Sequence, residues 1–352
     1  MYHSRITPAA LMVDAASGFP DAINALAANG LSGHHFLRAA WFAAGAPLGG
    51  ETLMIRRDNG DLVAAIPTTP FGPGLIGARK VPGSYWPHRG ILAAGNATCT
   101  ELAAALSGRA ARRLGPVWRL GPVPQDDPAT GLLIAAATEA GWHVLLQTAG
   151  TVWSIDLDAL RDQGWPSKST ARKLRRYEKR IHDLGQVTWR YVRGDDWDDS
   201  ALDQMGMVES GSWVASQTDG SGAKFMLPHQ RAVWQGVLAD RRLAEMLCAT
   251  ILLIDGRAVA FSLDLDDGPL QYGIAGSYIK ELRDYSLGRL VNYRTVTDAI
   301  ADGQSTLDLG AGDSGYKAEM GAVPDYDLTD LLFVRNPLLA RVLGPWWRRQ
   351  GV

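Results

Sequence analysis

The segment from Asp308 to Lys317 holds the densest group of residues that could take part in chemistry. Its sequence, Asp-Leu-Gly-Ala-Gly-Asp-Ser-Gly-Tyr-Lys, combines three glycines with two aspartates, a tyrosine and a lysine at the end of an apolar, strand-like run. The carboxylates of Asp308 and Asp313 could accept a proton, and the hydroxyl of Tyr316 could donate one. The end of such a strand is where α/β proteins bind ligands. A tight turn, with glycine at positive φ and aspartate as a cap, would produce the same pattern.

Two regions of the chain show the same order of predicted elements, and the second would position this segment. Apolar runs flank Asp58–Asp61 and Asp255–Arg257, which predicts two β-hairpins. Each hairpin is followed by a loop, a helix and a strand ending in Leu-Gly, at Gly121 in the first half and Gly310 in the second. This repeated order favours a duplicated α/β unit, although it also arises without duplication.

The predicted elements are short and separated by clear turn signals. Gly115-Pro116 and Asp302-Gly303 end two of the helices. The predicted helices span 98–114, 128–140 and 287–301, and the predicted strands span 117–120, 142–157, 246–254, 258–263, 270–275 and 306–309.

Composition indicates an ordinary globular protein with sizeable hydrophobic cores. At about 150 residues per domain, the 352 residues predict two domains. Hydrophobic residues make up 46% of the chain and charged residues 20%, which excludes disorder and disulfide scaffolds. A formal charge of −2 argues against a nucleic-acid coat. The two cysteines, Cys99 and Cys248, lack metal-ligand spacing, and no apolar stretch approaches the ~18 residues of a membrane span. We therefore expect a cytoplasmic protein without a metal.

The segment 168–184 is the most strongly charged part of the chain. Seven basic residues and one acidic residue lie between Lys168 and Arg180, while Leu174, Tyr177 and Ile181 recur at helical spacing. The pattern predicts an amphipathic helix with a cationic face. That face could be solvated, or it could bind a phosphorylated donor, a carrier protein or an anionic lipid.

Several motifs between residues 167 and 317 together resemble those of a known family. They are Trp213, Asp255-Gly-Arg-Ala-Val-Ala-Phe261, Tyr285-Ser-Leu-Gly-Arg289, Asp308-Leu-Gly-Ala-Gly-Asp313 with Tyr316-Lys317, and Ser167-Lys-Ser-Thr-Ala-Arg-Lys-Leu-Arg-Arg176. Together they resemble the CelD/BcsL-type branch of the GNAT acyltransferases, which is related to the FemAB-like ligases. The resemblance covers roughly 153–334, and the first half resembles it only as a degenerate tandem domain.

The resemblance implies an α/β fold of tandem GNAT-like domains, each with a mixed, mostly antiparallel central sheet flanked by helices. Residues 1–153 would form a degenerate N-terminal domain, and 154–336 a catalytic domain that includes the basic helix. Residues 337–352 would form an amphipathic tail. Its leucines, paired tryptophans and arginines suit contact with a membrane surface or docking on the tail's own core.

The resemblance also implies a thioester donor in a gap between two strands of the second domain. The pantetheine arm would pair with the strand 270–275, where a backbone N–H could polarise the thioester carbonyl. Its phosphates would lie at the start of the helix near Leu287, because helix N-termini attract anions. The phosphate loop departs from the usual GNAT pattern, so either acyl-CoA or an acyl carrier protein could be the donor. The donor-binding residues implied are Tyr272, Gly273, Ile274, Arg283, Ser286, Gly288, Arg289 and Lys317.

The proposed chemistry needs a base and an acid, because an amine acceptor is mostly protonated at neutral pH. Asp313 or Asp308 would take up the proton of the incoming ammonium, and Tyr316 would protonate the departing thiolate. Each could instead have a structural role, as a turn cap or a core tyrosine. The acyl and acceptor groups would contact Trp213, Tyr278, Tyr285, Arg172 and His88.

We therefore predict an N-acyltransferase that moves an acyl group from a thioester to a small-molecule or lipid amine, in envelope polysaccharide or lipid biosynthesis. The alternatives are a lipid N-acylase such as a bacterial ceramide synthase, an aminoacyl-tRNA-dependent ligase, and a non-catalytic scaffold of an envelope-synthesis complex. An acyl carrier protein is an expected partner, and nucleic acid is not. Through its tail the cytoplasmic protein would contact the inner face of the membrane.

Overall fold

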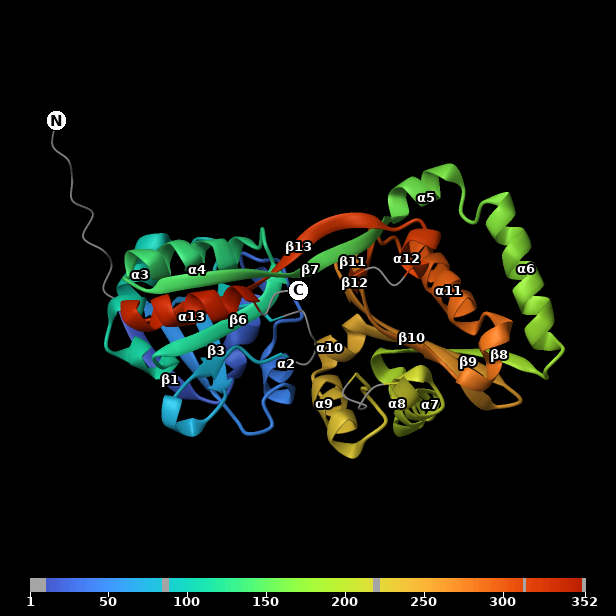
Figure 1. The fold of residues 1–352 in the computed structure, drawn as a ribbon, viewed down its shortest axis with the longest axis horizontal. Helices are drawn as coiled ribbons and strands as arrows, with labels where there is room; N and C mark the ends of the chain where they lie inside the picture. The colour runs from blue at the N-terminus through green and yellow to red at the C-terminus, as the bar shows by residue number, and fades with distance from the viewer. Residues whose placement is uncertain (1–10, 84–88, 218–221, 313–314, 350–352) are drawn as a thin grey trace. The chain divides into compact units, whose positions relative to one another are not determined.

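The chain folds into two compact units (Figure 1). A computed structural model describes residues 11–83, 89–217, 222–312 and 315–349. Unit 1 comprises residues up to 151 together with 326 onwards, and unit 2 comprises 152–325. Each unit contains a mixed, mostly antiparallel sheet flanked by helices, which confirms the predicted fold class.

Unit 1 is built around a sheet with the strand order β1-β2-β3-β4-β6-β13, and β5 pairs with β3. Its strands are β1 Leu11–Ser17, β2 Glu51–Arg57, β3 Leu62–Pro70, β4 Arg79–Lys80, β5 Leu92–Ala93, β6 Val117–Pro124, the first part of β7 His143–Asp156, and most of β13 Val323–Val334. Its helices are α1 Asn24–Asn29, α2 Ala39–Ala44, α3 Cys99–Ser107, α4 Pro128–Glu139 and α13 Pro337–Arg349, with short 3-10 turns at Asp21–Ile23, Gly74–Ile76 and Ala110–Leu114.

Local sequence signals explain the elements of unit 1 that were predicted. The β2–β3 hairpin turns at Gly60, which has φ +89°. Thr98 and Glu101 form a capping box at the start of α3. The helix predicted to run to 114 is shorter, because Gly108 is extended and the chain continues as a 3-10 turn.

Unit 2 has the strand order β8-β9-β10-β11-β12-β7. The strands are β8 Val187–Arg193, β9 Leu247–Ile254, β10 Arg257–Asp267, β11 Leu270–Tyr278, β12 Thr306–Ala311 and the end of β7. The helices are α5 Leu157–Gln163, α6 Lys168–His182, α7 Asp199–Ser210, α8 Trp213–Gln217, α9 Pro228–Leu238, α10 Arg241–Met246, α11 Leu287–Ala301 and α12 Tyr316–Glu319, with 3-10 turns at Gly194–Asp196 and Lys280–Tyr285.

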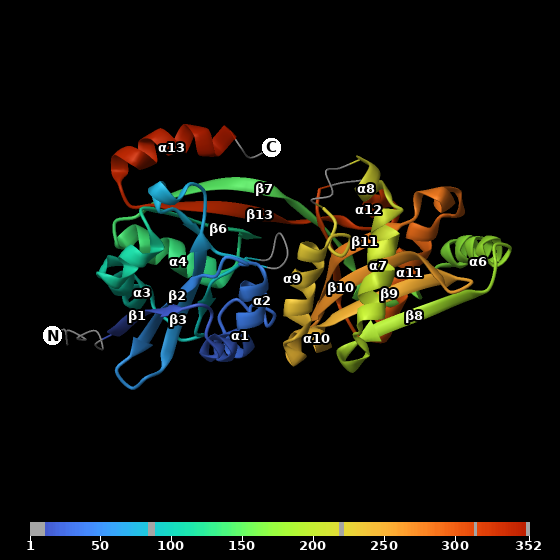
Figure 2. The same ribbon diagram turned by 90° about the horizontal axis from the view of Figure 1, so that it is seen from below.

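The sheet of unit 2 is covered on both faces (Figures 1 and 2). Helix α11 lies on one face, and α7, α9 and α10 lie on the other. Helix α11 has the bounds that the sequence predicts, and α6 begins as predicted, with the Ser167 hydroxyl accepting a hydrogen bond from the amide of Thr170. Helix α6 contacts α11 and the 3-10 turn Lys280–Tyr285.

The boundaries between the units differ from the expected ones. The sequence placed residues up to 336 in the second domain, but from Tyr326 onwards the chain belongs to unit 1. The reason is that β13 pairs with β6 from Leu328 to Val334, and α13 then packs on the same unit.

Candidate active site

Strands β11 and β12 form a fork in the sheet of unit 2. They pair in parallel over three residue pairs, the last of which joins Tyr272 to Asp308. Beyond this point β11 continues to Tyr278, and β12 to Ala311, without further pairing between them. Backbone groups of β11 that face β12 therefore have no strand partner there, which leaves them available to an extended ligand.

A β-bulge in β11 lies next to the apex of this fork. Leu263 of β10 pairs with Ala275, while Asp264 pairs with Gly273, so that Ile274 is the extra residue. A bulge bends its strand and leaves the extra residue outside the ladder, and bulges are frequent beside active sites. Three residues of β11 are expected to contact the donor. Tyr272 belongs to the last pair between β11 and β12, and Gly273 and Ile274 are the first residues of β11 beyond that pair.

Gly273 lies where the two strands separate, and the space around it is tight. A Cβ atom at this position would be 3.2 Å from the carbonyl oxygen of Asp308 and 3.7 Å from Oδ1 of Asp264. Glycine therefore allows the close approach of β11, β12 and the Asp264 carboxyl group at the apex.

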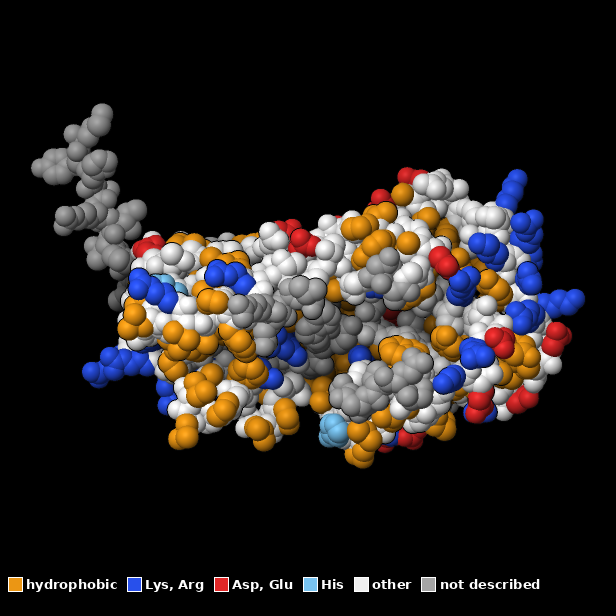
Figure 3. Space-filling view, in the orientation of Figure 1, with side chains coloured by type: hydrophobic (Ala, Val, Ile, Leu, Met, Phe, Trp, Pro, Cys, Tyr) orange, Lys and Arg blue, Asp and Glu red, His pale blue; other side chains and the backbone are white. Residues whose placement is uncertain are grey.

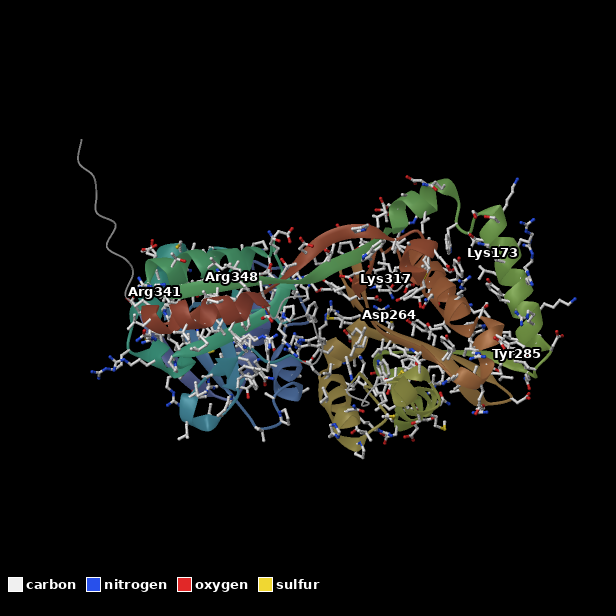
Figure 4. The ribbon with its side chains drawn as sticks, in the orientation of Figure 1. Lys173, Asp264, Tyr285, Lys317, Arg341 and Arg348 are labelled. Atoms are coloured by element: carbon white, nitrogen blue, oxygen red, sulfur yellow. The ribbon has the colours of Figure 1, made fainter. Side chains whose placement is uncertain are left out.

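The Asp264 carboxyl group, which the sequence did not single out, is buried beside this apex (Figure 4). The Ser262 hydroxyl donates a hydrogen bond of 2.7 Å to Asp264 Oδ2. Burial raises the pKa of Asp264 to about 8, so that the carboxyl group is mostly protonated at neutral pH. Burial also raises the pKa of Asp266, to about 6, against the opposing effect of the Arg193 guanidinium 2.8 Å away.

The start of α11 has an unusual backbone conformation. Ser286 has φ +60° and caps the helix without a side-chain hydrogen bond. Asp255 is the other described non-glycine residue with positive φ, and it lies in the β9–β10 hairpin turn, where this conformation is expected. Ser286 has no such explanation, and strained residues of this kind cluster at ligand sites. The free amides of a helix N-terminus attract anions, as the predicted phosphate site requires.

Two further predicted residues meet at this helix start. A Cβ atom on Gly288 would be 3.0 Å from the ring of Tyr278, so the close packing of that ring requires glycine in α11. The structure thus brings Tyr278, expected at the acyl or acceptor site, against Gly288, expected at the phosphate site.

The arginines near the helix start are differently engaged. Arg283 is exposed and lies near Asp284. Arg289 forms an ion pair with Glu319, and a hydrogen bond with Tyr177 of α6 raises the pKa of its guanidinium. The guanidinium of Arg180, a residue of α6, lies 5.1 Å from the ring centre of Tyr285, so Tyr285 lies beside that helix (Figure 4).

Lys317 is buried and holds the loop after β12. Its ammonium group donates hydrogen bonds to the carbonyl oxygens of Gly310 at 2.7 Å, Ala311 at 3.1 Å and Gly312 at 2.7 Å. These contacts make Lys317 an internal support of the loop in this structure, and its contact with a donor phosphate stays a prediction.

Replacing Lys317 with methionine is expected to lower the free energy of unfolding by about 3 kcal/mol, because three carbonyl groups lose a charged donor. Urea denaturation measures this change. Lys173→Met, on the exposed side of α6, is the matched control and should change stability by less than about 0.5 kcal/mol. An equally small effect at Lys317 would contradict the supporting role.

The expected acid–base residues have distinct environments. Asp308 is buried, and its Oδ1 accepts a hydrogen bond of 2.6 Å from the amide of Gly310, so that it shapes the turn. Tyr316 begins α12, and with 38% of its surface exposed it is not a core residue. Asp313 lies outside the described residues.

The remaining predicted residues are more widely distributed. Trp213 begins α8 with its side chain partly exposed, and the amide of Lys280, in the 3-10 turn after β11, donates to the carbonyl of Gly211, two residues before Trp213. Arg172 is exposed on α6. His88 lies outside the described residues. In the described part of the chain, no three His, Cys, Asp or Glu side chains are grouped to hold a metal ion.

Comparisons with known proteins agree on the fold. Residues 168–318 match the family model described as an acetyltransferase (GNAT) domain. Among solved structures, FemX matches with a TM-score of 0.60 at 11% identity, covering 91% of this chain and 97% of FemX. No curated protein matches the sequence.

Two further structures are similar over almost their whole length. One is the C-terminal domain of a protein from Agrobacterium fabrum that is provisionally named a lysylphosphatidylglycerol synthetase, with a TM-score of 0.56, 14% identity and coverage of 92% of both chains. The other is a tandem GNAT protein from the clavulanic acid biosynthesis pathway, with a TM-score of 0.52, 15% identity and coverage of 93% of this chain and 99% of the other. Part of unit 2 is thus similar in sequence to the acetyltransferase (GNAT) family model, and the whole chain is similar in fold to these tandem GNAT-like structures.

Proposed function

We propose that the GNAT domain at 168–318 is an N-acyltransferase that moves an acyl group from a thioester to an amine. The observation that carries this proposal is the fork between β11 and β12, with a bulge at Ile274 beside its apex. An extended pantetheine arm would pair with the open side of β11, and the thioester carbonyl would face a backbone amide near the bulge. Such an amide stabilises the negative charge that develops on the carbonyl oxygen during attack.

The transfer proceeds by direct attack of the amine on the thioester carbon. Asp308 or Asp313 takes a proton from the ammonium, directly or through water, and the free amine then forms the C–N bond. The tetrahedral intermediate collapses with cleavage of the C–S bond, the nitrogen loses its second proton to solvent, and Tyr316 protonates the leaving thiolate. Amide and thiol are the products, the aspartate releases its proton to water, and Tyr316 takes up a proton from water.

The donor side of this site is cationic. Helix α6 contacts the turn before α11, and its exposed basic residues form no ion pair in the described part of the chain. These residues are Lys168, Arg172, Lys173, Arg175, Arg176 and Lys179. With the start of α11 they suit the phosphates of acyl-CoA or the acidic surface of an acyl carrier protein. We further propose that the protein belongs to the CelD/BcsL branch and acts in envelope biosynthesis.

The same exposed cations favour one second candidate, an aminoacyl-tRNA-dependent ligase. The fold is similar to that of FemX, and the sequence resembles a branch that is related to the FemAB-like ligases. Such a ligase would bind tRNA with an affinity that falls steeply with salt concentration. Filter binding of tRNA at low and moderate salt separates this candidate from a thioester-dependent enzyme.

The test of the proposed chemistry is thiol release from a panel of acyl-CoAs and acyl carrier protein in the presence of amines. We expect Tyr316→Phe to lower kcat about 100-fold, as loss of a general acid does, with thioester affinity retained. The matched control is Tyr191→Phe, on the similarly exposed Tyr191 of β8, which should leave turnover unchanged. Full turnover in Tyr316→Phe would remove the tyrosine from the mechanism.

A further inference from the structure

Helix α13 of unit 1 has two apolar faces. Leu339, Leu343 and Trp347 pack against the sheet. On the adjoining face, about 100° around the helix axis, Leu338, Val342 and Trp346 are spaced four residues apart and form a row, with 67%, 72% and 51% of their surfaces exposed. An apolar row of this size is unusual on a surface that contacts only water.

A second element of unit 1 exposes large apolar side chains. In the turn between β3 and β4, Phe71, Leu75 and Ile76 are exposed, and Leu75 is fully so. Figure 3 shows hydrophobic side chains gathered on and below α13 on this face, and Figure 4 shows Arg341 and Arg348 on the helix.

Three cations lie between these two elements. Lys80 is 5.5 Å from the ring centre of Phe71, and the Arg119 guanidinium is 5.8 Å from that of Trp347. Lys80 and Arg119 are register partners of adjacent strands and so share one face of the sheet. Burial lowers the pKa of Lys80, and the positive charge of Arg89 lowers it further. Burial likewise lowers the pKa of Arg89, and the charge of Arg119 adds to this effect, so the three cations lie close together.

This cluster carries more positive than negative charge. Asp330 is paired with Arg119 and is the carboxylate that also acts on Arg89. Arg89 Nε is buried without a hydrogen-bond partner. The flanking sequences 62–100 and 331–352 contain arginine and lysine but no aspartate or glutamate. The cluster is therefore suited to bind an anion.

We propose that unit 1 docks on the surface of an anionic phospholipid bilayer. The outer row of α13 and the turn 71–77 enter the boundary between headgroups and acyl chains, and Lys80, Arg89 and Arg119 bind a lipid phosphate between them. At the surface of a bilayer, lipid phosphates lie directly above the acyl chains. The phosphates match the cluster of cations, and the acyl chains match the exposed apolar side chains. Four of its six exposed apolar side chains, Leu75, Ile76, Leu338 and Val342, are aliphatic and do not stack on bases, so the surface suits a bilayer better than RNA.

The test is sedimentation of the full chain with vesicles of phosphatidylcholine alone and of phosphatidylcholine with phosphatidylglycerol. We expect binding to the anionic vesicles and at least tenfold weaker binding to the neutral ones. The double variant Val342→Glu with Trp346→Glu should reduce binding at least tenfold. Leu146→Glu, on the similarly exposed Leu146 of β7, is the control and should bind as the wild type does.

The second double variant, Lys80→Ala with Arg89→Gln, tests the phosphate site. It relieves repulsion among the cations, so we expect an unchanged or higher melting temperature together with at least fivefold weaker binding to anionic vesicles. Equal binding to both vesicle types, wild-type binding by either double variant, or binding of inorganic phosphate without binding of vesicles would each overturn the proposal. The proposal does not depend on the transfer chemistry of unit 2.

Discussion

Replacing Gly273 with valine is expected to abolish thioester binding and turnover. A Cβ atom at this position would already be 3.2 Å from the carbonyl oxygen of Asp308, so the valine methyl groups must fill the apex of the fork or push β12 away. Gly273→Ala should have a smaller effect of the same kind, about tenfold in affinity, because one methyl group needs less space. Thermal melts and acyl-CoA titrations of both variants measure the series.

Gly276, three residues further along β11, provides the matched control. A Cβ atom there would find the carbonyl oxygen of Phe261 at 3.7 Å, an ordinary contact. Gly276→Ala should therefore retain thioester affinity within about threefold, an effect of less than about 1 kcal/mol. If Gly273→Val folds and binds thioesters as the wild type does, the fork is not the donor site.

The variant Asp264→Asn is expected to remove a marked pH dependence of stability. Burial raises the pKa of Asp264 from 3.8 to about 8 in the folded protein, so the folded state retains a proton that the unfolded state has lost. Stability from this group is fully present below about pH 4 and is lost as the pH rises towards 8. The loss amounts to roughly 6 kcal/mol at most, because each pH unit between the unfolded and folded pKa values contributes about 1.36 kcal/mol.

Denaturant unfolding at pH 5 and pH 9 tests this expectation. Asparagine is neutral in both states, and the variant should be the more stable protein at pH 9 by several kcal/mol, with a much smaller difference at pH 5. Asp284→Asn, at an exposed position beside Arg283, is the control and should follow the wild type at both pH values. A wild-type pH dependence in Asp264→Asn would show that this carboxyl group is not the cause.

Elements with strong local signals could be predicted from the sequence. The hairpins at Gly60 and Gly256, helix α11 and the start of α6 depend on turn glycines, apolar periodicity and caps within a few residues. Strand β13 was not predicted, because its partner β6 is about two hundred residues away and the pairing leaves no local pattern. Helices α7 to α10 were also missed, and of these α8 and α10, with five and six residues, are too short to show a helical periodicity.

The interior polar groups of unit 2 were missed for a different reason. Ser262, Asp264 and Asp266 alternate with apolar residues along β10, a pattern that normally indicates one face in water. Here α11 covers the sheet, and all three side chains are buried. Lys317 was predicted to contact the donor, and in the structure three carbonyl groups of the β12–α12 loop hold its ammonium group in the interior, where lysines are rare. Such positions depend on tertiary packing.

The proposed function requires that an acyl thioester occupies the fork between β11 and β12. Native mass spectrometry of the purified protein, with acyl-CoAs from acetyl to palmitoyl and with acylated carrier protein, tests it most directly. We expect a one-to-one complex of the wild type with at least one of these thioesters, which Gly276→Ala keeps and Gly273→Val loses. A wild-type protein that binds none of them would contradict it.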